Sequence, residues 1–147
     1  MREILFRGKR INNGEWVYGN YCGAEYFEGD GIEHLIIEIS RNGSSAHIIP
    51  ETVEQYTGLT DKNGKKIFEG DIVKADDYIF VVKFGKCGGV ANAENFGYIG
   101  FYFEAFSEST KLSAKYGLRD DICYFTDIEV IGNIHDNPEL LKGGGEI

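Results

Sequence analysis

Apolar and polar residues alternate along much of the chain, a pattern typical of β-strands that bury one face. Residues 3–9 and 15–22 are strand-like stretches on either side of Asn13-Gly14, whose residues accept the positive φ angles of tight turns. We therefore predict that the chain opens with a β-hairpin. Residues 32–39 place Leu35, Ile37 and Ile39 on one face of a strand. The pattern breaks at residues 42–45 and resumes at residues 46–49, which predicts a second hairpin.

Further strands are predicted throughout the second half. They cover residues 53–59, 67–74, 77–84, 97–106, 122–125 and 127–134. Gly70 interrupts the second of these stretches and predicts a bend or bulge, where Asp71 could hydrogen-bond to nearby backbone N–H groups. Five or six short strands joined by tight turns are the usual content of a small closed barrel.

Helix is expected only in short segments. A single turn begins at Pro50, a short helix spans residues 107–116 with Ser107 as its cap, and a last turn begins at Pro138. Residues that favour strands, such as Ile, Val, Phe and Tyr, outnumber the helix formers Leu, Ala and Met. The fold class that follows is mostly β with one or two helical turns.

The predicted elements group into two β regions and a tail. Residues 1–50 form an N-terminal hairpin-rich region, and residues 51–142 form the region with the content of a small barrel. Residues 143–147 contain three consecutive glycines and predict a flexible tail.

Charge and cysteine content limit the environment in which the protein works. The net charge is −9 and both halves of the chain are acidic, so the surface repels the phosphate backbone of nucleic acids. Cys22, Cys87 and Cys123 include no C-x-x-C pair, which suits free thiols in a reducing compartment. No run of about 18 uncharged apolar residues is present, so we expect a cytoplasmic protein that does not enter membranes.

Three blocks of sequence resemble one known family. They read FRGKRINNGEWVYG at residues 6–19, ETVEQYTGLTDKNGKKIFEGDIVK at residues 51–74 and EVIGNIHDNPELL at residues 129–141. Together, and in this order, they resemble the YopX family of phage and prophage proteins. The resemblance implies a phage or prophage origin and a second half similar to an SH3-like barrel. It implies no catalytic residues.

One cluster combines basic and aromatic side chains. Because the Asn13-Gly14 turn folds the first two strands together, it brings into proximity Arg7, Lys9, Arg10, Trp16 and Tyr18. Such a cluster is a candidate nucleic-acid contact, since aromatic rings stack on bases and cations bind phosphates. The preferred interpretation is a structural hairpin with aromatic residues facing the core and solvated cations, given the overall negative charge.

Other candidate chemistry is sparse. Cys87 lies between Lys86 and two glycines, a setting that could lower the pKa of its thiol and keep it accessible. The pair His135-Asp136 could act as a base and its orienting carboxylate, but a turn that caps the last helical segment is the better interpretation. The histidines and cysteines show no metal-ligand spacing, so no cofactor is expected.

The stretch 97–106 carries apolar side chains on both faces of a predicted strand. The residues proposed as an oligomer interface are Tyr98, Phe101, Tyr102, Phe103 and Phe106. Antiparallel sheets in small domains usually leave one face polar, so a second copy of the chain or a second sheet within it must cover this surplus. We favour a homo-oligomer.

The sequence therefore leads to two hypotheses about function. The first is a non-enzymatic interaction or regulatory protein that self-associates and binds an unidentified phage or host protein, because no set of nucleophile, base and oxyanion donors can be assembled. The alternative is a small nucleic-acid-binding module that uses the basic and aromatic hairpin. A thiol enzyme that uses Cys87 is a third, less favoured option.

Overall fold

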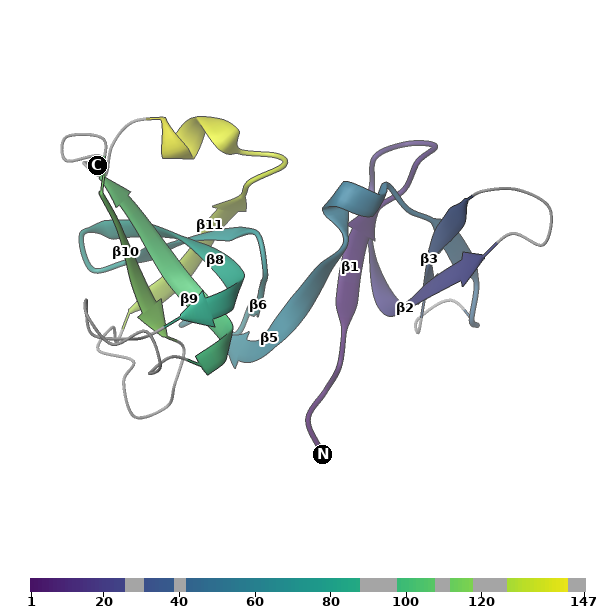
Figure 1. Cartoon of the computed structure of the whole chain (residues 1–147), viewed down its shortest axis with the longest axis horizontal. Coiled ribbons are helices and arrows are strands. Elements are labelled where there is room, and N and C mark those ends of the chain that lie inside the picture. The colour runs from purple at the N-terminus through teal and green to yellow at the C-terminus, as the bar shows by residue number, and fades with distance from the viewer. Residues whose placement is uncertain (26–30, 39–41, 88–97, 108–111, 118–126, 143–147) are drawn as a thin grey trace. The chain divides into compact units, whose positions relative to one another are not determined.

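A computed structural model gives the fold of the protein (Figure 1). It describes residues 1–25, 31–38, 42–87, 98–107, 112–117 and 127–142. The chain divides into two compact units, Met1–Gly58 and Leu59–Ile147. The boundary that the sequence predicts between the two β regions, at residue 50, lies about the length of one strand before the division at Gly58.

Unit 1 consists of antiparallel strands and one short 3₁₀ segment. Its elements are β1 (Phe6–Lys9), β2 (Trp16–Glu25), β3 (Ile32–Glu38), β4 (Ser45–His47), η1 (Pro50–Thr52) and β5 (Glu54–Thr60), which carries the chain into unit 2. The strand order is β4-β3-β2-β1-β5, with β6 (Lys66–Phe68) following β5. Both predicted hairpins and the helical turn at Pro50 are present.

The core of unit 1 follows from the alternation in its strands. Its buried residues are Val17, Ile36, Ala46 and Ile48, and the partly buried Phe6 and Val53 pack against them. Gly19 lies in β2 opposite Glu38, where a Cβ atom would meet the backbone carbonyl of Ile37 well inside van der Waals contact. The absence of a side chain at Gly19 therefore allows β2 and β3 to pair closely.

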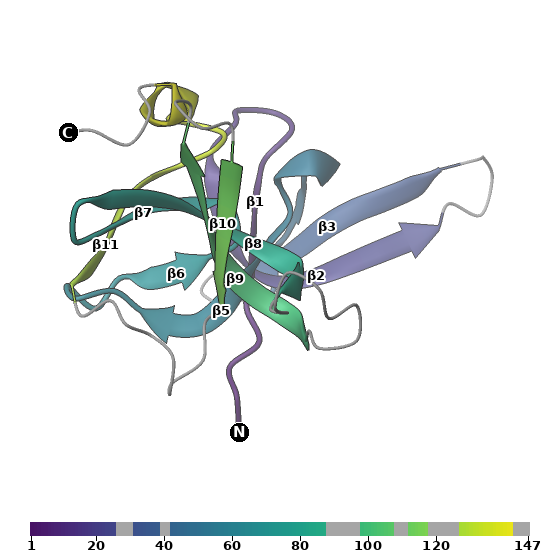
Figure 2. The ribbon, with the colours of Figure 1, turned by 60° about the vertical axis from the view of Figure 1, so that its left-hand side comes forward.

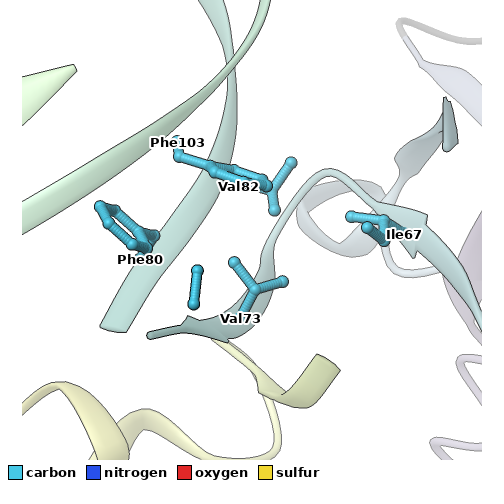
Figure 3. Close-up of a cluster of buried hydrophobic side chains, with 6 residues drawn as sticks. Ile67, Val73, Phe80, Val82 and Phe103 are labelled. Atoms are coloured by element: carbon cyan, nitrogen blue, oxygen red, sulfur yellow. The ribbon is translucent and has the colours of Figure 1, made fainter. Parts of the chain in front are cut away.

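Unit 2 contains the second sheet. Its elements are β6 (Lys66–Phe68), β7 (Asp71–Ala75), β8 (Tyr78–Cys87), β9 (Tyr98–Ser107), β10 (Leu112–Gly117), β11 (Ile128–Asn133) and the 3₁₀ segment η2 (Pro138–Leu141). Five strands form one antiparallel sheet in the order β10-β9-β8-β7-β11 (Figure 2). The core cluster shown in Figure 3 consists of Ile67, Val73, Ala75, Phe80, Val82 and Phe103.

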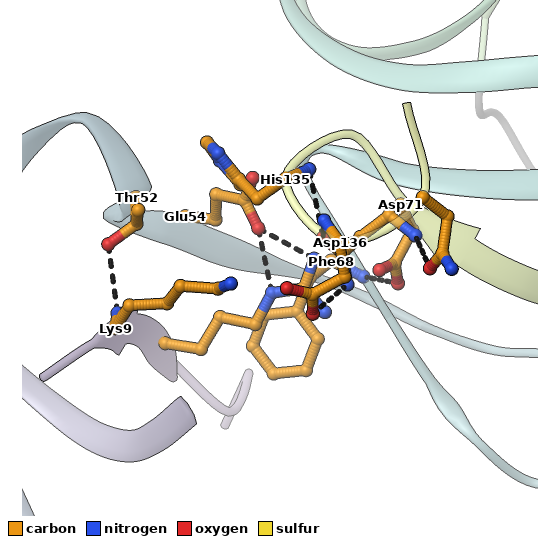
Figure 4. Close-up of polar contacts among 10 residues, drawn as sticks. Lys9, Thr52, Glu54, Phe68, Asp71, His135 and Asp136 are labelled. Atoms are coloured by element: carbon orange, nitrogen blue, oxygen red, sulfur yellow. Dashed lines mark hydrogen bonds and ion pairs between the residues drawn. The ribbon is translucent and has the colours of Figure 1, made fainter. Parts of the chain in front are cut away.

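A bend at Gly70 separates β6 from β7, as the sequence predicts. Gly70 has a φ angle of +79°, a left-handed conformation that glycine adopts without steric cost. The backbone N–H of Phe68 donates to Oδ2 of Asp71 at 2.8 Å, so the buried Asp71 carboxylate closes the bend (Figure 4). This confirms the proposed role of the aspartate.

Two sequence-based expectations about unit 2 differ from the structure. The helix predicted over residues 107–116 is wrong, because β9 extends to Ser107 and Leu112–Gly117 form strand β10 along its edge. The capping signals at Ser107 and Gly117 are local, and strand pairing over six residues overrides them. The mostly β class is confirmed, but the closed barrel is not: among the described residues β10 and β11 are the two outer strands of an open order.

The strand predicted at residues 122–125 and the predicted tail at residues 143–147 lie outside the residues that the structure describes. In the described part of the chain, no helix is long and apolar enough to cross a membrane.

Candidate interaction surfaces

The β1–β2 hairpin brings together most of the predicted basic and aromatic cluster. Its register places Arg7 opposite Tyr18 and Lys9 opposite Trp16, so the four residues lie on one face of the two strands. The guanidinium carbon of Arg7 lies 4.7 Å from the centroid of the Trp16 ring, and Nζ of Lys9 lies 5.4 Å from it. Both cations therefore make cation–π contacts with the same indole.

Arg7 forms a buried ion pair that the sequence pattern does not indicate. The Nε atom of Arg7 donates to Oε2 of Glu54 at 2.7 Å, and the Nη2 atom of Arg7 lies 2.6 Å from the same oxygen. The two side chains are 6% and 5% exposed, so the guanidinium charge is neutralised inside the protein. Glu54 is distant in sequence, and no local pattern marks it as the partner.

Arg10 follows β1 and forms a different ion pair. Its guanidinium donates to a carboxylate oxygen of Glu38 at the end of β3, and that carboxylate is also buried. Next to this pair lies a cavity of about 240 Å³, lined by Arg10, Ile11, Asn12, Ser45, Ala46 and His47. The charge of Arg10 is therefore balanced by Glu38 of β3.

The two aromatic members of the cluster differ in accessibility. Tyr18 is 45% exposed, whereas Trp16 is half-buried beneath the two cations. The backbone N–H of Lys9 donates to Oγ1 of Thr52 at 2.8 Å, which joins β1 to the η1 turn (Figure 4). Tyr18 is thus the aromatic ring of this cluster that offers the most surface to solvent.

The β8–β9 hairpin ends in an apolar cluster that the core does not fully cover. Phe84 is 51% exposed and Ile99 is 75% exposed, and the half-buried Phe101 contacts Phe84 edge-on with ring centroids 5.0 Å apart. These three residues continue the same face as Val82 and Phe103, which are buried in the core of unit 2. We call Phe84, Ile99 and Phe101 the β8–β9 apolar cluster.

The proposed interface residues fall into three groups. Tyr102 and Phe103 are buried within the chain itself, so neither offers surface to a partner. Phe101 belongs to the β8–β9 apolar cluster. The side chains of Tyr98 and Phe106, and the candidate reactive thiol of Cys87, lie outside the described residues, although their backbones belong to β9 and β8.

The Asp61 carboxylate lies in the turn that joins β5 to β6 and ties this turn to β11. Oδ1 accepts hydrogen bonds from the N–H groups of Asn63 and Lys65 at 2.8 and 2.9 Å, and Oδ2 accepts one from Val130 at 3.0 Å. Burial raises the pKa of the Asp61 carboxyl. The three hydrogen bonds and the nearby Lys65 ammonium outweigh burial, so this pKa lies below the usual 3.8.

The histidines have structural contacts. Nδ1 of His34 lies 2.6 Å from the hydroxyl of Tyr21, and the two rings stack. The N–H groups of His135 and Asp136 donate to Oδ1 of Asn133 at 3.0 and 2.9 Å, which gives a turn at these residues. The expected capping of the last helical segment is wrong, because Asn137 makes no side-chain hydrogen bond to the start of η2 and its Oδ1 accepts instead from the N–H of Asn133 at 3.3 Å. In the ranges that the structure describes, no group of three or more His, Cys, Asp or Glu residues could hold a metal ion.

Comparison with known proteins identifies a family. Among solved structures, the chain is similar to the crystal structure of protein EF1440 from Enterococcus faecalis, with 24% sequence identity and a TM-score of 0.44. The similarity covers 96% of this chain and 99% of that chain. No curated protein matches the chain significantly. A family model described as YopX protein matches residues 5–142, nearly the whole length, and the chain therefore belongs to the YopX family.

Proposed function

We propose that the protein is a phage- or prophage-encoded cytoplasmic interaction protein that has no enzymatic activity and self-associates. The resemblance to phage and prophage sequences supports the origin, and the exposed free thiol of Cys22 suits a reducing compartment. A single observation carries the self-association, namely the β8–β9 apolar cluster.

The cluster has the chemistry of a contact between copies of this chain. Each aromatic side chain removed from water buries on the order of 150–250 Å², which favours association. The chain has a net charge of −9, so two copies approach most easily where carboxylates are absent. Phe84, Ile99 and Phe101 are uncharged, and the residue opposite Ile99 is the cationic Lys86. Two acidic chains can meet at this cluster without bringing carboxylates together.

The test replaces one exposed ring with a charge and measures the mass of the particle. Phe84→Lys should lower the molar mass measured by sedimentation at micromolar concentration, because an ammonium cannot be buried without a partner. Ile11→Lys is the matched control, since Ile11 is 63% exposed in the other unit. It should leave the mass unchanged. Equal masses for Phe84→Lys and the unchanged chain would show that this cluster is not a contact between copies.

Nucleic-acid binding through the basic and aromatic hairpin is the competing function. Arg7 and Arg10 already balance the charges of Glu54 and Glu38, which weighs against phosphate as their ligand. A titration of labelled single- and double-stranded DNA and RNA at low salt tests it. Binding that weakens steeply with salt and disappears in Tyr18→Ala would make this hairpin the principal functional surface.

A further inference from the structure

The β2–β3 hairpin has an edge that no other strand among the described residues covers. β1 pairs with β2 over Trp16–Gly19, whereas β3 pairs with β2 over Gly19–Glu25. In the part of the chain that the structure describes, Asn20–Glu25 thus have a partner strand on one side and none on the other. The two strands extend together as an arm (Figure 2).

The direction of the backbone groups shows which residues could accept a further strand. The N–H of Glu38 donates to Ser44, and the carbonyl of His34 accepts from Ile48, so both residues direct their backbone groups toward β4. Their partners in the ladder are Gly19 and Gly23 of β2. In an antiparallel ladder, the backbone N–H and C=O groups of two opposite residues either point toward each other or both point away. The backbone groups of Gly19 and Gly23 therefore point away from β3. Every second residue of a strand points the same way, so those of Tyr21 also point outward from the hairpin.

This edge lacks the features that normally protect an open strand. Native edge strands carry charges, prolines or bulges that discourage pairing with another chain. The segment Gly19–Ala24 reads GNYCGA and contains no charged residue and no proline. Asn20, Cys22 and Gly23 are exposed. A two-stranded ribbon is only marginally stable alone, so an added strand would stabilise the arm.

We propose that the open edge of β2 pairs antiparallel with the same edge of a second copy of this chain. A second copy fits because the chain carries a charge of −9, and the neutral segment Asn20–Ala24 can pair with itself without opposing two carboxylates. This contact lies in unit 1 and is separate from the β8–β9 apolar cluster of unit 2, but it deepens the proposed self-association and rests on it.

The symmetry fixes a register that can be tested. A two-fold axis at the centre of the neutral segment places Cys22 opposite Cys22 of the second copy and Asn20 opposite Ala24. These are non-hydrogen-bonded pairs, in which Cα atoms lie about 4.5 Å apart, within the range that a disulfide spans. Asn20 and its own counterpart would lie about 13 Å apart, four residues along the strand, which is too far for a disulfide.

Disulfide trapping of the full chain tests the register. Cys87→Ser and Cys123→Ser leave Cys22 as the single thiol, and mild oxidation should convert more than about half of the chain to a reducible dimer. Adding Cys22→Ser gives a chain without cysteine. Two variants of that chain, one with Asn20→Cys and one with Ala24→Cys, should cross-link to each other when they are mixed. Each of these two variants alone should give at least about five-fold less dimer, because its thiols are out of register.

A backbone substitution provides an independent measurement. Gly23→Pro removes an N–H group that points outward, so it should abolish the Cys22 cross-link while the circular dichroism of the chain is retained. The pairing is overturned if Cys22 fails to cross-link, or if Asn20→Cys alone links as well as the mixture. If the cross-link fails while the mass stays above that of one chain, the β2 contact is wrong and self-association still stands. A monomeric mass would end both proposals.

Discussion

The Asp61 carboxylate, which accepts three backbone hydrogen bonds, gives a prediction at the scale of a single residue. Asp61→Asn removes the charge and turns an N–H₂ group toward one of the donors, so the free energy of unfolding should fall by about 1–3 kcal/mol. Asp77→Asn removes the same charge from an exposed turn and should change this free energy by less than about 0.5 kcal/mol. Urea denaturation followed by circular dichroism measures both.

The effect of Asp61 should also depend on pH with a defined sign. The pKa of this carboxyl is lowered in the folded protein, so its stabilisation is present above the unfolded value of about 3.8 and is lost as pH falls through the folded value. The stability gap between the unchanged chain and Asp61→Asn should therefore be constant near neutral pH and shrink below about pH 4. A gap that widens in acid would contradict the assigned hydrogen bonds.

The ion pair between Arg7 and Glu54 leads to a second prediction at this scale. Glu54→Gln leaves a buried guanidinium without its counter-charge, and such changes cost about 3–5 kcal/mol. The matched control is Glu129→Gln, because the Lys62–Glu129 pair is about 40% exposed and such pairs contribute about 0–1 kcal/mol. Similar losses for the two variants, measured by urea denaturation, would show that the Arg7 pair is not effectively buried.

At the scale of elements, sequence reasoning succeeds where the signal is local. The turn at Asn13-Gly14 and the bend at Gly70 depend on residues that accept positive φ, so the strands on either side could be predicted. The strand β10 could not, because its pairing with β9 is a tertiary contact that opposes local capping signals. The same reason hides Glu54, which lies 47 residues from Arg7.

The pairing of β2 with β3 gives a prediction for an element. Gly19→Ala should destabilise unit 1 by about 3 kcal/mol or more, because the added methyl group meets the Ile37 carbonyl and forces the strands apart. Glu15→Ala changes an exposed residue just before β2 and should be within about 0.5 kcal/mol of the unchanged chain. The half-buried Trp16 lies in the same strand, so its fluorescence during urea denaturation reports both variants.

At the scale of the whole molecule, charge and apolar surface oppose each other. A net charge of −9 on every copy repels association, whereas the β8–β9 apolar cluster and the uncharged β2 edge favour it. Because salt screens the repulsion and leaves apolar contacts intact, self-association should strengthen between about 20 mM and 500 mM NaCl. Binding to nucleic acid has the opposite salt dependence. Sedimentation at several salt concentrations distinguishes the two, and a mass that falls with salt would contradict an apolar contact.

Self-association is the central claim, and the molar mass of the unchanged chain tests it most directly. Static light scattering at micromolar concentration and moderate salt should give a mass at least twice the 16.5 kDa of one chain. The mass should decrease on dilution as the contacts dissociate. A mass of 16.5 kDa that stays constant over the concentration range would contradict the claim.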